Sequence, residues 1–108
     1  MNYSTAAECW QQIEDSKLAE LRLALVRAAI HYSAQRVQWR LVRPENRIAM
    51  SPARTAAHNA FIDTCNILSR NMLKSGEVNG WRNLLGTDRQ EIGDFACYVV
   101  LFLGLDAR

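Results

Sequence analysis

The sequence predicts an all-α protein, a small bundle of three long helices and one or two short ones in a single domain over residues 1–108. Three observations lead to this fold class. Only two prolines and five glycines occur in 108 residues. Apolar residues recur every three or four positions, and strand-like alternation is hard to find. Apolar residues make up 49% and charged residues 22% of the chain, as in ordinary globular domains.

The first helix is expected to begin at Thr5. Thr5 and Glu8 fit a capping box, in which each side chain satisfies an exposed backbone N–H group of the other residue. The apolar phase then slips by one residue near Asp15-Ser16. One unbroken helix over residues 6–42 would be about 55 Å long, against a radius of gyration of about 13 Å for such a domain. We therefore expect a break or kink at 15–16, with a long helix covered by a partner chain as the alternative.

The next helix is predicted to carry apolar residues on two faces, which indicates that it is covered on two sides. The first face carries Leu21, Leu25, Ala29, Tyr32 and Trp39, and the second carries Leu23, Ile30 and Val37 at seven-residue intervals. Pro44 is expected to end this helix, because the residue before a proline is pushed out of helical backbone. The segment RPENRIAM, residues 43–50, is therefore expected to be a connector.

A third long helix is predicted to start at Ser51 and Pro52, a capping hydroxyl followed by proline in the first helical position. It is expected to run to about Lys74, where Ser75-Gly76 supplies a stop signal. A single short helix is expected over residues 81–85, between two glycines.

The last helix is expected to begin at Thr87, which forms a second capping box with Gln90, and to end at Gly104 in a Schellman motif. No charge occurs between Asp94 and Asp106. A helix that is apolar on nearly every side competes with the long second helix for the centre of the bundle, so we expect a homodimer. The residues expected at its interface are Phe95, Tyr98, Val99, Leu101, Phe102 and Leu105.

The helix over residues 52–74 carries a row of polar residues at steps of four, three and four, which a helix places on one side. Two interpretations are open besides surface decoration. The row is a structural clasp if the last helix packs antiparallel to this one, so that Arg70 meets an acid there. Alternatively, it lines a polar pocket for a small ligand or a partner's side chain. The row consists of Asn59, Asp63, Asn66 and Arg70, and its expected neighbours are Arg54, His58, Asp88, Arg89 and Asp94.

A basic strip, RVQWRLVRPENR, lies where the second helix is expected to end. Arginines beside an aromatic ring are typical of nucleic-acid binding, because guanidinium groups contact phosphates and the ring stacks on a base. The net charge of the whole chain is only +2, so a solvated arginine face whose stems cover the edge of the core is the alternative. The strip consists of Arg36, Trp39, Arg40, Arg43 and Arg47, and Arg36, Arg40 and Arg43 are expected on one helical face.

No catalytic constellation is evident, so we expect no catalytic residue, metal or cofactor. His31 and His58 are far apart, and neither has a cysteine or carboxylate one turn away. Cys65 lies seven residues from His58, which is about 10 Å along a helix and too far for a nucleophile and its base. The glycines form no phosphate-binding pattern.

Cys9, Cys65 and Cys97 are far apart among apolar neighbours and are expected to be buried free thiols. The first fifteen residues hold three acids and no basic leader, so we expect a cytoplasmic protein. The longest uncharged run has eleven residues, whereas a membrane span needs about 20. No membrane partner is expected.

The segments RTAAHNAFIDTCNILSR and DRQEIGDFA resemble the paired motifs of a family of small bacterial helical proteins of unknown function. The shared pattern is Arg, then Ala-His-Asn, then Asn-x-Leu-x-Arg, and later Asp-Arg with Asp-Phe-Ala, over about residues 54–96. The family has no assigned activity, so the resemblance implies no catalytic residue.

The sequence therefore favours a non-enzymatic protein that binds another macromolecule as an inhibitor or adaptor. Two alternatives stay open. One is nucleic-acid binding through the basic strip, and the other is a small-ligand pocket lined by the helix over residues 54–70.

Overall fold

A computed structural model describes residues 3–74, 81–85 and 88–103 of the chain. Every element in these ranges is helical, which confirms the all-α fold class. The elements are α1 (Ser4–Gln11), α2 (Ser16–Leu41), the 3-10 turn η1 (Pro44–Asn46), α3 (Arg47–Lys74), α4 (Trp81–Leu85), α5 (Arg89–Tyr98) and the π-helical turn η2 (Val99–Leu103). Two helices are long, α2 with 26 residues and α3 with 28, and α5 is continued by η2.

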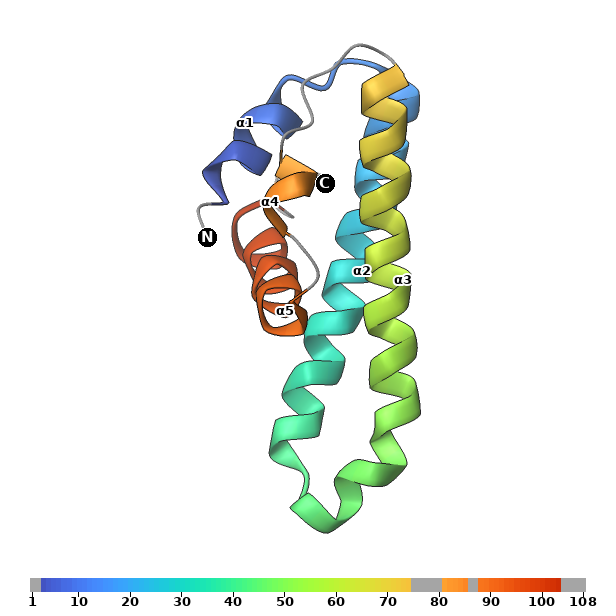
Figure 1. Cartoon of the computed structure of the whole chain (residues 1–108), viewed down its shortest axis with the longest axis vertical. Helices are drawn as coiled ribbons and strands as arrows, with labels where there is room; N and C mark the ends of the chain where they lie inside the picture. The colour runs from blue at the N-terminus through green and yellow to red at the C-terminus, as the bar shows by residue number, and fades with distance from the viewer. Residues whose placement is uncertain (1–2, 75–80, 86–87, 104–108) are drawn as a thin grey trace.

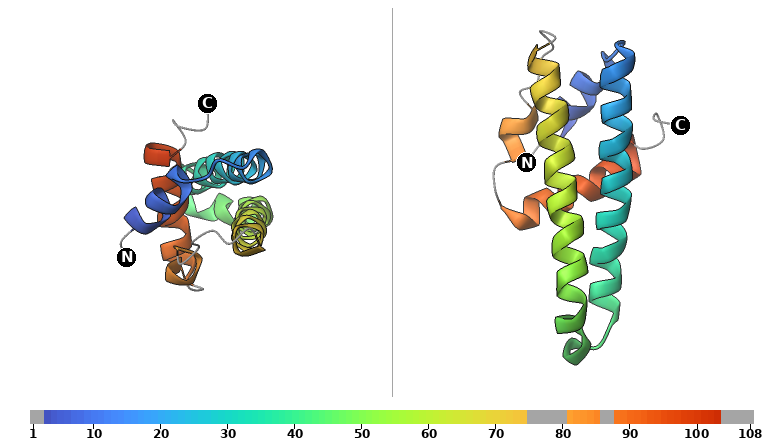
Figure 2. Two further views of the ribbon diagram at one scale, coloured as in Figure 1. Left: turned by 90° about the horizontal axis from the view of Figure 1, so that it is seen from above. Right: turned by 90° about the vertical axis from the view of Figure 1, so that its right-hand side faces the viewer.

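The molecule is built on the hairpin of α2 and α3, and its principal extents are 48 × 27 × 20 Å. Figure 1 shows α1, α4 and α5 gathered against one half of this hairpin, so that the end around η1 projects beyond them. Figure 2 shows α5 crossing obliquely over both long helices. The last helix therefore does not lie antiparallel to α3, which was the condition for the structural-clasp interpretation of the polar row.

One cluster of apolar side chains fills the space between the hairpin and the shorter helices. Phe61 of α3 and Phe95 of α5 lie at its centre, with ring centroids 6.1 Å apart. Trp81 stacks on Phe95 at 6.2 Å, and Trp10 meets the edge of Trp81 at 5.3 Å. Burying each such side chain stabilises the fold by about 1.5–3 kcal/mol. The aromatic rings thus join α1, α3, α4 and α5 into one core.

The predicted break at residues 15–16 is confirmed, because α1 ends at Gln11 and α2 starts at Ser16. The Asp15 carboxylate accepts hydrogen bonds from the backbone N–H groups of Lys17 at 2.9 Å and Leu18 at 3.0 Å. This N-cap satisfies two donors that a helix start leaves unpaired. The first helix is therefore separate from α2, and it packs its own apolar side chains into the core.

The start of α1 differs from the predicted capping box. The helix begins at Ser4, and its N-cap residue Tyr3 makes no side-chain capping bond. The Tyr3 ring instead packs 5.3 Å from Phe95, and its hydroxyl donates to the Glu91 carbonyl at 3.3 Å. Tertiary contacts with α5, rather than a local cap, hold this end of the helix.

The hairpin turn also differs from the prediction, because α3 begins at Arg47 instead of near Pro52. The 3-10 turn at Pro44 leads directly into α3, so much of the expected connector is helical. The Ser51 hydroxyl donates to the Arg47 carbonyl at 3.2 Å, one turn earlier in the same helix. Ser51 is therefore not a cap, and Pro52 lies inside α3.

The short helix α4 occupies the predicted residues 81–85. The N-cap of α5 is Asp88, whose carboxylate accepts from the Gln90 backbone N–H at 2.8 Å. The prediction that Thr87 is the cap is therefore wrong. Thr87 itself lies outside the described residues, as do the predicted stop signals at Ser75-Gly76 and at Gly104 with Leu105.

The helix α2 is covered on two sides, by α3 and by α5 with η2, but not through the second predicted face. Leu25, Ala29 and Tyr32 of the first face are at most 1% exposed. In contrast, Ile30 is 51% exposed and Val37 is 55% exposed. The stripe of Leu23, Ile30 and Val37 therefore lies on a third side of α2, which the described part of the chain leaves largely open.

We predict that Asp15→Ala destabilises the fold by about 1 kcal/mol, because two backbone donors at the start of α2 lose their acceptor. Chemical denaturation followed by circular dichroism measures this difference. Glu14→Ala is the matched control, since Glu14 is an exposed neighbour and an ordinary surface change stays within about 0.5 kcal/mol. Equal effects of the two substitutions would contradict the assigned cap.

Candidate functional site

The polar row on α3 borders a hollow of about 480 Å³, lined by Asp63, Asn66, Ile67, Ser69 and Arg70. Asn66 is half-buried, and its side-chain oxygen accepts a 2.8 Å hydrogen bond from the Nε of Arg82 in α4. Asn59, Asp63 and Arg70 are exposed. The row thus faces the side of the molecule on which α4 lies, and Arg82 is a contact residue that the sequence did not single out.

A clasp between Arg70 and an acid of α5, one of the two interpretations of the row, is not seen among the described residues. Asp88 caps its own helix, and Asp94 pairs with Arg36 of α2 at 3.6 Å. Within the described residues, Arg70 forms no ion pair with an acid of α5. The reason is the oblique crossing of α5, which directs Asp94 toward α2 instead of α3. Arg89 is exposed.

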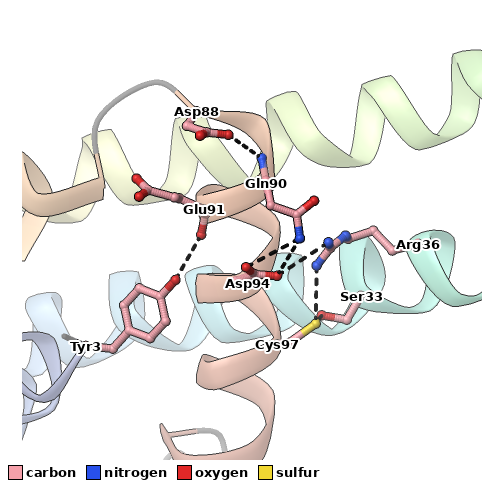
Figure 3. Close-up of polar contacts among 8 residues, drawn as sticks. All are labelled: Tyr3, Ser33, Arg36, Asp88, Gln90, Glu91, Asp94 and Cys97. Carbon is pink, nitrogen blue, oxygen red and sulfur yellow. Dashed lines mark hydrogen bonds and ion pairs between the residues drawn. The ribbon is translucent and has the colours of Figure 1, made fainter. Parts of the chain in front are cut away.

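A different polar cluster joins α2 to α5, and Figure 3 shows it around the guanidinium group of Arg36. Arg36 is only 8% exposed. One of its terminal nitrogens faces the Asp94 carboxylate, and the other lies 3.5 Å from the Cys97 sulfur. Ser33 also approaches this sulfur, at 3.8 Å. A buried cation needs such partners, because its desolvation is costly.

Gly93 allows this cluster to form. A Cβ atom on Gly93 would lie 2.5 Å from the Cζ atom of Arg36, which is closer than real Cβ contacts allow. The guanidinium therefore lies directly against the backbone of α5. The side-chain amide of Gln90, one turn before Asp94 on α5, donates to the Asp94 carboxylate at 3.3 Å. These contacts give Arg36 a structural role in fixing the crossing of α5.

The basic strip does not form a single surface. Arg36 lies beneath α5, whereas Arg40 and Arg43 are exposed. The guanidinium of Arg47 lies 4.4 Å from the centre of the Trp39 ring, and that of Arg54 lies 4.7 Å from it. The ring is thus occupied by two cations from α3. This arrangement disagrees with the expectation of one arginine face beside an aromatic ring that is free to stack on a base.

His58, predicted as a neighbour of the polar row, points toward the core of the hairpin. Its ring meets the edge of Tyr32 at 5.3 Å, and its Nδ1 atom lies 3.2 Å from the side-chain oxygen of Asn59. Arg54 belongs to the Trp39 cluster instead of the row. The nine residues predicted to gather around the row are therefore divided among several neighbourhoods.

The three cysteines are free thiols, as predicted. Cys9 and Cys65 are buried, but Cys97 is only partly buried, so the prediction of three buried thiols holds for two of them. Burial raises the pKa of the Cys65 thiol to about 12 and raises the pKa of Cys9 as well. Within the described ranges, no group of three or more His, Cys, Asp or Glu side chains is placed to hold a metal ion.

Comparison with known proteins gives no relative from which a role can be transferred. The chain matches no family model, no curated protein and no solved structure. The resemblance over residues 54–96 therefore stays a prediction. Among the described residues, no helix combines the length and apolar character that crossing a membrane requires.

We predict that Gly93→Ala destabilises the wild-type chain by about 1–2 kcal/mol, because the added methyl group displaces the buried Arg36 guanidinium. In an Arg36→Ala background the same change should be neutral or stabilising, since alanine favours a helix over glycine by about 0.8–1.0 kcal/mol. Urea denaturation of the four proteins in this double-mutant cycle provides the measurement. Equal costs in both backgrounds would rule out the assigned contact.

We also predict that one thiol of the native protein reacts rapidly with a disulfide reagent near pH 8, and that this thiol is Cys97. The thiolate is the reactive form, and the raised pKa values of Cys9 and Cys65 keep those buried thiols protonated at this pH. Absorbance of the released thiolate reports the rate. Cys97→Ser should remove the rapid phase, and all three thiols should react in denaturant. Rapid reaction of Cys65 in the native protein would contradict its position in the core.

Proposed function

We propose that this is a non-enzymatic binding protein that acts through its helical surfaces and associates with a second copy of itself. The observation that carries the proposal is the set of large apolar side chains that stay exposed on α2 and on η2, two elements that contact each other. These side chains are Ile30, Val37, Leu101 and Phe102, and each of them is more than half exposed. Figure 2 shows η2 emerging beside α2, on the side away from α3.

The predicted interface of Phe95–Leu105 divides into an inner and an outer part. Phe95, Val99 and Leu103 are buried in the core of the same chain. Tyr98 is half-buried and packs 5.0 Å from Phe102, while Leu101 is 65% exposed and Phe102 is 62% exposed. Leu105 lies outside the described residues. The outer part supports self-association, because each such side chain gains about 1.5–3 kcal/mol when it is fully removed from water.

The spacing of the uncovered residues on α2 favours a helical partner. The half-buried Leu23 and the exposed Ile30 and Val37 follow at intervals of seven, which is the repeat that brings side chains of one helix repeatedly against another helix. A second copy of the chain supplies the same apolar helix, and most soluble oligomers pair equivalent surfaces in this way. A convex helical stripe of this kind fits a macromolecule better than a small ligand.

The hollow on α3 supports a second candidate, a site for a small polar ligand. Asp63, Asn66 and Arg70 present an acid, an amide and a cation along its edge, and such groups orient ligands by hydrogen bonds. Equilibrium dialysis against a metabolite mixture tests this candidate, with Arg70→Ala as the variant that should lose binding.

Nucleic-acid binding has less support, because Arg36 is buried and the Trp39 ring is occupied by two guanidinium groups.

We predict that the protein forms a dimer at tens of micromolar, as measured by sedimentation equilibrium or by light scattering on a sizing column. Ile30→Glu combined with Leu101→Glu should give a monomer, because buried unpaired charges oppose association. Leu73→Glu is the matched control, since Leu73 is 67% exposed on α3, away from this surface. A monomeric wild-type chain would remove the self-association part of the proposal.

A further inference from the structure

The free end of the α2–α3 hairpin combines positive charge with exposed aliphatic groups. We define the hairpin end as residues 40–54, the part that projects beyond α1, α4 and α5 in Figure 1. Its only charged residues are four arginines and one acid, which give it a net charge of +3 against +2 for the whole chain. These residues are Arg40, Arg43, Arg47, Arg54 and Glu45.

Two aliphatic side chains at the hairpin end are unusually exposed to solvent. Leu41, the last residue of α2, is 79% exposed, and Ile48, in the first turn of α3, is 83% exposed. They are the most exposed large apolar residues in the described part of the chain. Both lie beside arginines in the sequence, Leu41 after Arg40 and Ile48 after Arg47. A projecting surface of this composition favours a partner that offers anionic and apolar groups together.

The arginines of α3 are held in place at this end. The Nε of Arg47 donates to the Trp39 carbonyl at 3.0 Å, and one of its terminal nitrogens donates to the Arg40 carbonyl at 3.4 Å. The guanidiniums of Arg47 and Arg54 both lie over the Trp39 ring. Their charge is thus concentrated near the end of the hairpin, and the ring that would stack on a nucleic-acid base is covered.

We propose that the hairpin end binds the surface of an anionic lipid bilayer, with Leu41 and Ile48 entering the boundary between headgroups and acyl chains. Arginine side chains there would lie at the depth of the lipid phosphates, where anionic headgroups attract them. The projecting end suits a deformable, flat surface. Nucleic acid offers phosphates but no apolar layer for the two aliphatic side chains. The proposed contact is peripheral, at the surface of the bilayer, and it departs from the sequence-based expectation of no membrane partner.

The proposal is tested by sedimentation of the full-length protein with extruded vesicles. One set contains phosphatidylcholine alone, and the other contains equal parts of phosphatidylcholine and phosphatidylglycerol. We expect binding to the anionic vesicles that weakens as salt is raised, and at least about tenfold weaker partitioning into the neutral ones. Running the same assay on the Ile30→Glu and Leu101→Glu double variant separates lipid binding from self-association.

Two pairs of variants assign the effect to the hairpin end. Leu41→Ser with Ile48→Ser, and separately Arg40→Gln with Arg43→Gln, should each lower partitioning by about tenfold. Leu73→Ser and Arg70→Gln are the matched controls, because both residues are exposed on α3 away from this end. The controls should bind like the wild type. Circular dichroism confirms that each variant is folded.

Three results would overturn the proposal. The first is equal partitioning into neutral and anionic vesicles. The second is wild-type partitioning of the Leu41 and Ile48 variant, which would show that the aliphatic side chains do not enter the bilayer. The third is binding to a labelled DNA duplex that needs Arg40 and Arg43, with no binding to anionic vesicles. That last result would make the hairpin end a nucleic-acid surface.

Discussion

The structure depends on the close crossing of α5 over the α2–α3 hairpin at Gly93. Because Gly93 has no side chain, the Arg36 guanidinium lies directly against the backbone of α5. Asp94 then reaches this cation, and Phe95, the next residue, enters the centre of the aromatic core. The polar contact of Arg36 and the apolar contact of Phe95 thus lie within one helical turn of α5. Because η2 directly continues α5, the same crossing also sets the direction of η2.

The position of this crossing decides which surfaces are left to bind a partner. The shorter helices cover only one half of the hairpin, so the end around η1 projects without support from them. They also cover one side of α2 and leave its stripe of Ile30 and Val37 open. The two surfaces differ in chemistry. The stripe is apolar and suits a helix of a second copy, whereas the hairpin end is cationic as well and suits an anionic surface.

Several arginines of the described chain hold helices together. Arg36 links α2 to α5, Arg82 links α4 to Asn66 of α3, and Arg47 ties the hairpin turn to Trp39. A guanidinium group is suited to this role because its five N–H donors and flat face serve a carboxylate, a carbonyl and an aromatic ring alike. Arginine content alone therefore did not identify a nucleic-acid surface, since several of these cations are already paired with groups of the protein itself.

Sequence alone determined the features that local physical chemistry controls. Apolar periodicity predicted the helices and the all-α class, and the phase slip located the break at Asp15. Pro44 correctly predicted the end of α2, and α4 occupies the predicted residues 81–85. The helix starts were less certain, because several neighbouring residues are competent caps. The N-cap of α5 is Asp88 instead of the predicted Thr87. At the start of α1, Tyr3 contacts α5 and makes no side-chain cap.

Only the tertiary structure decided which charged residues meet. Arg36 and Asp94 are 58 positions apart, and their pairing depends on the angle at which α5 crosses α2. That angle results from side-chain packing and from the missing Cβ atom of Gly93, which periodicity does not encode. The sequence therefore specified which helices form and which of their residues are apolar. The packing of those helices then decided which apolar faces became core and which remained open to a partner.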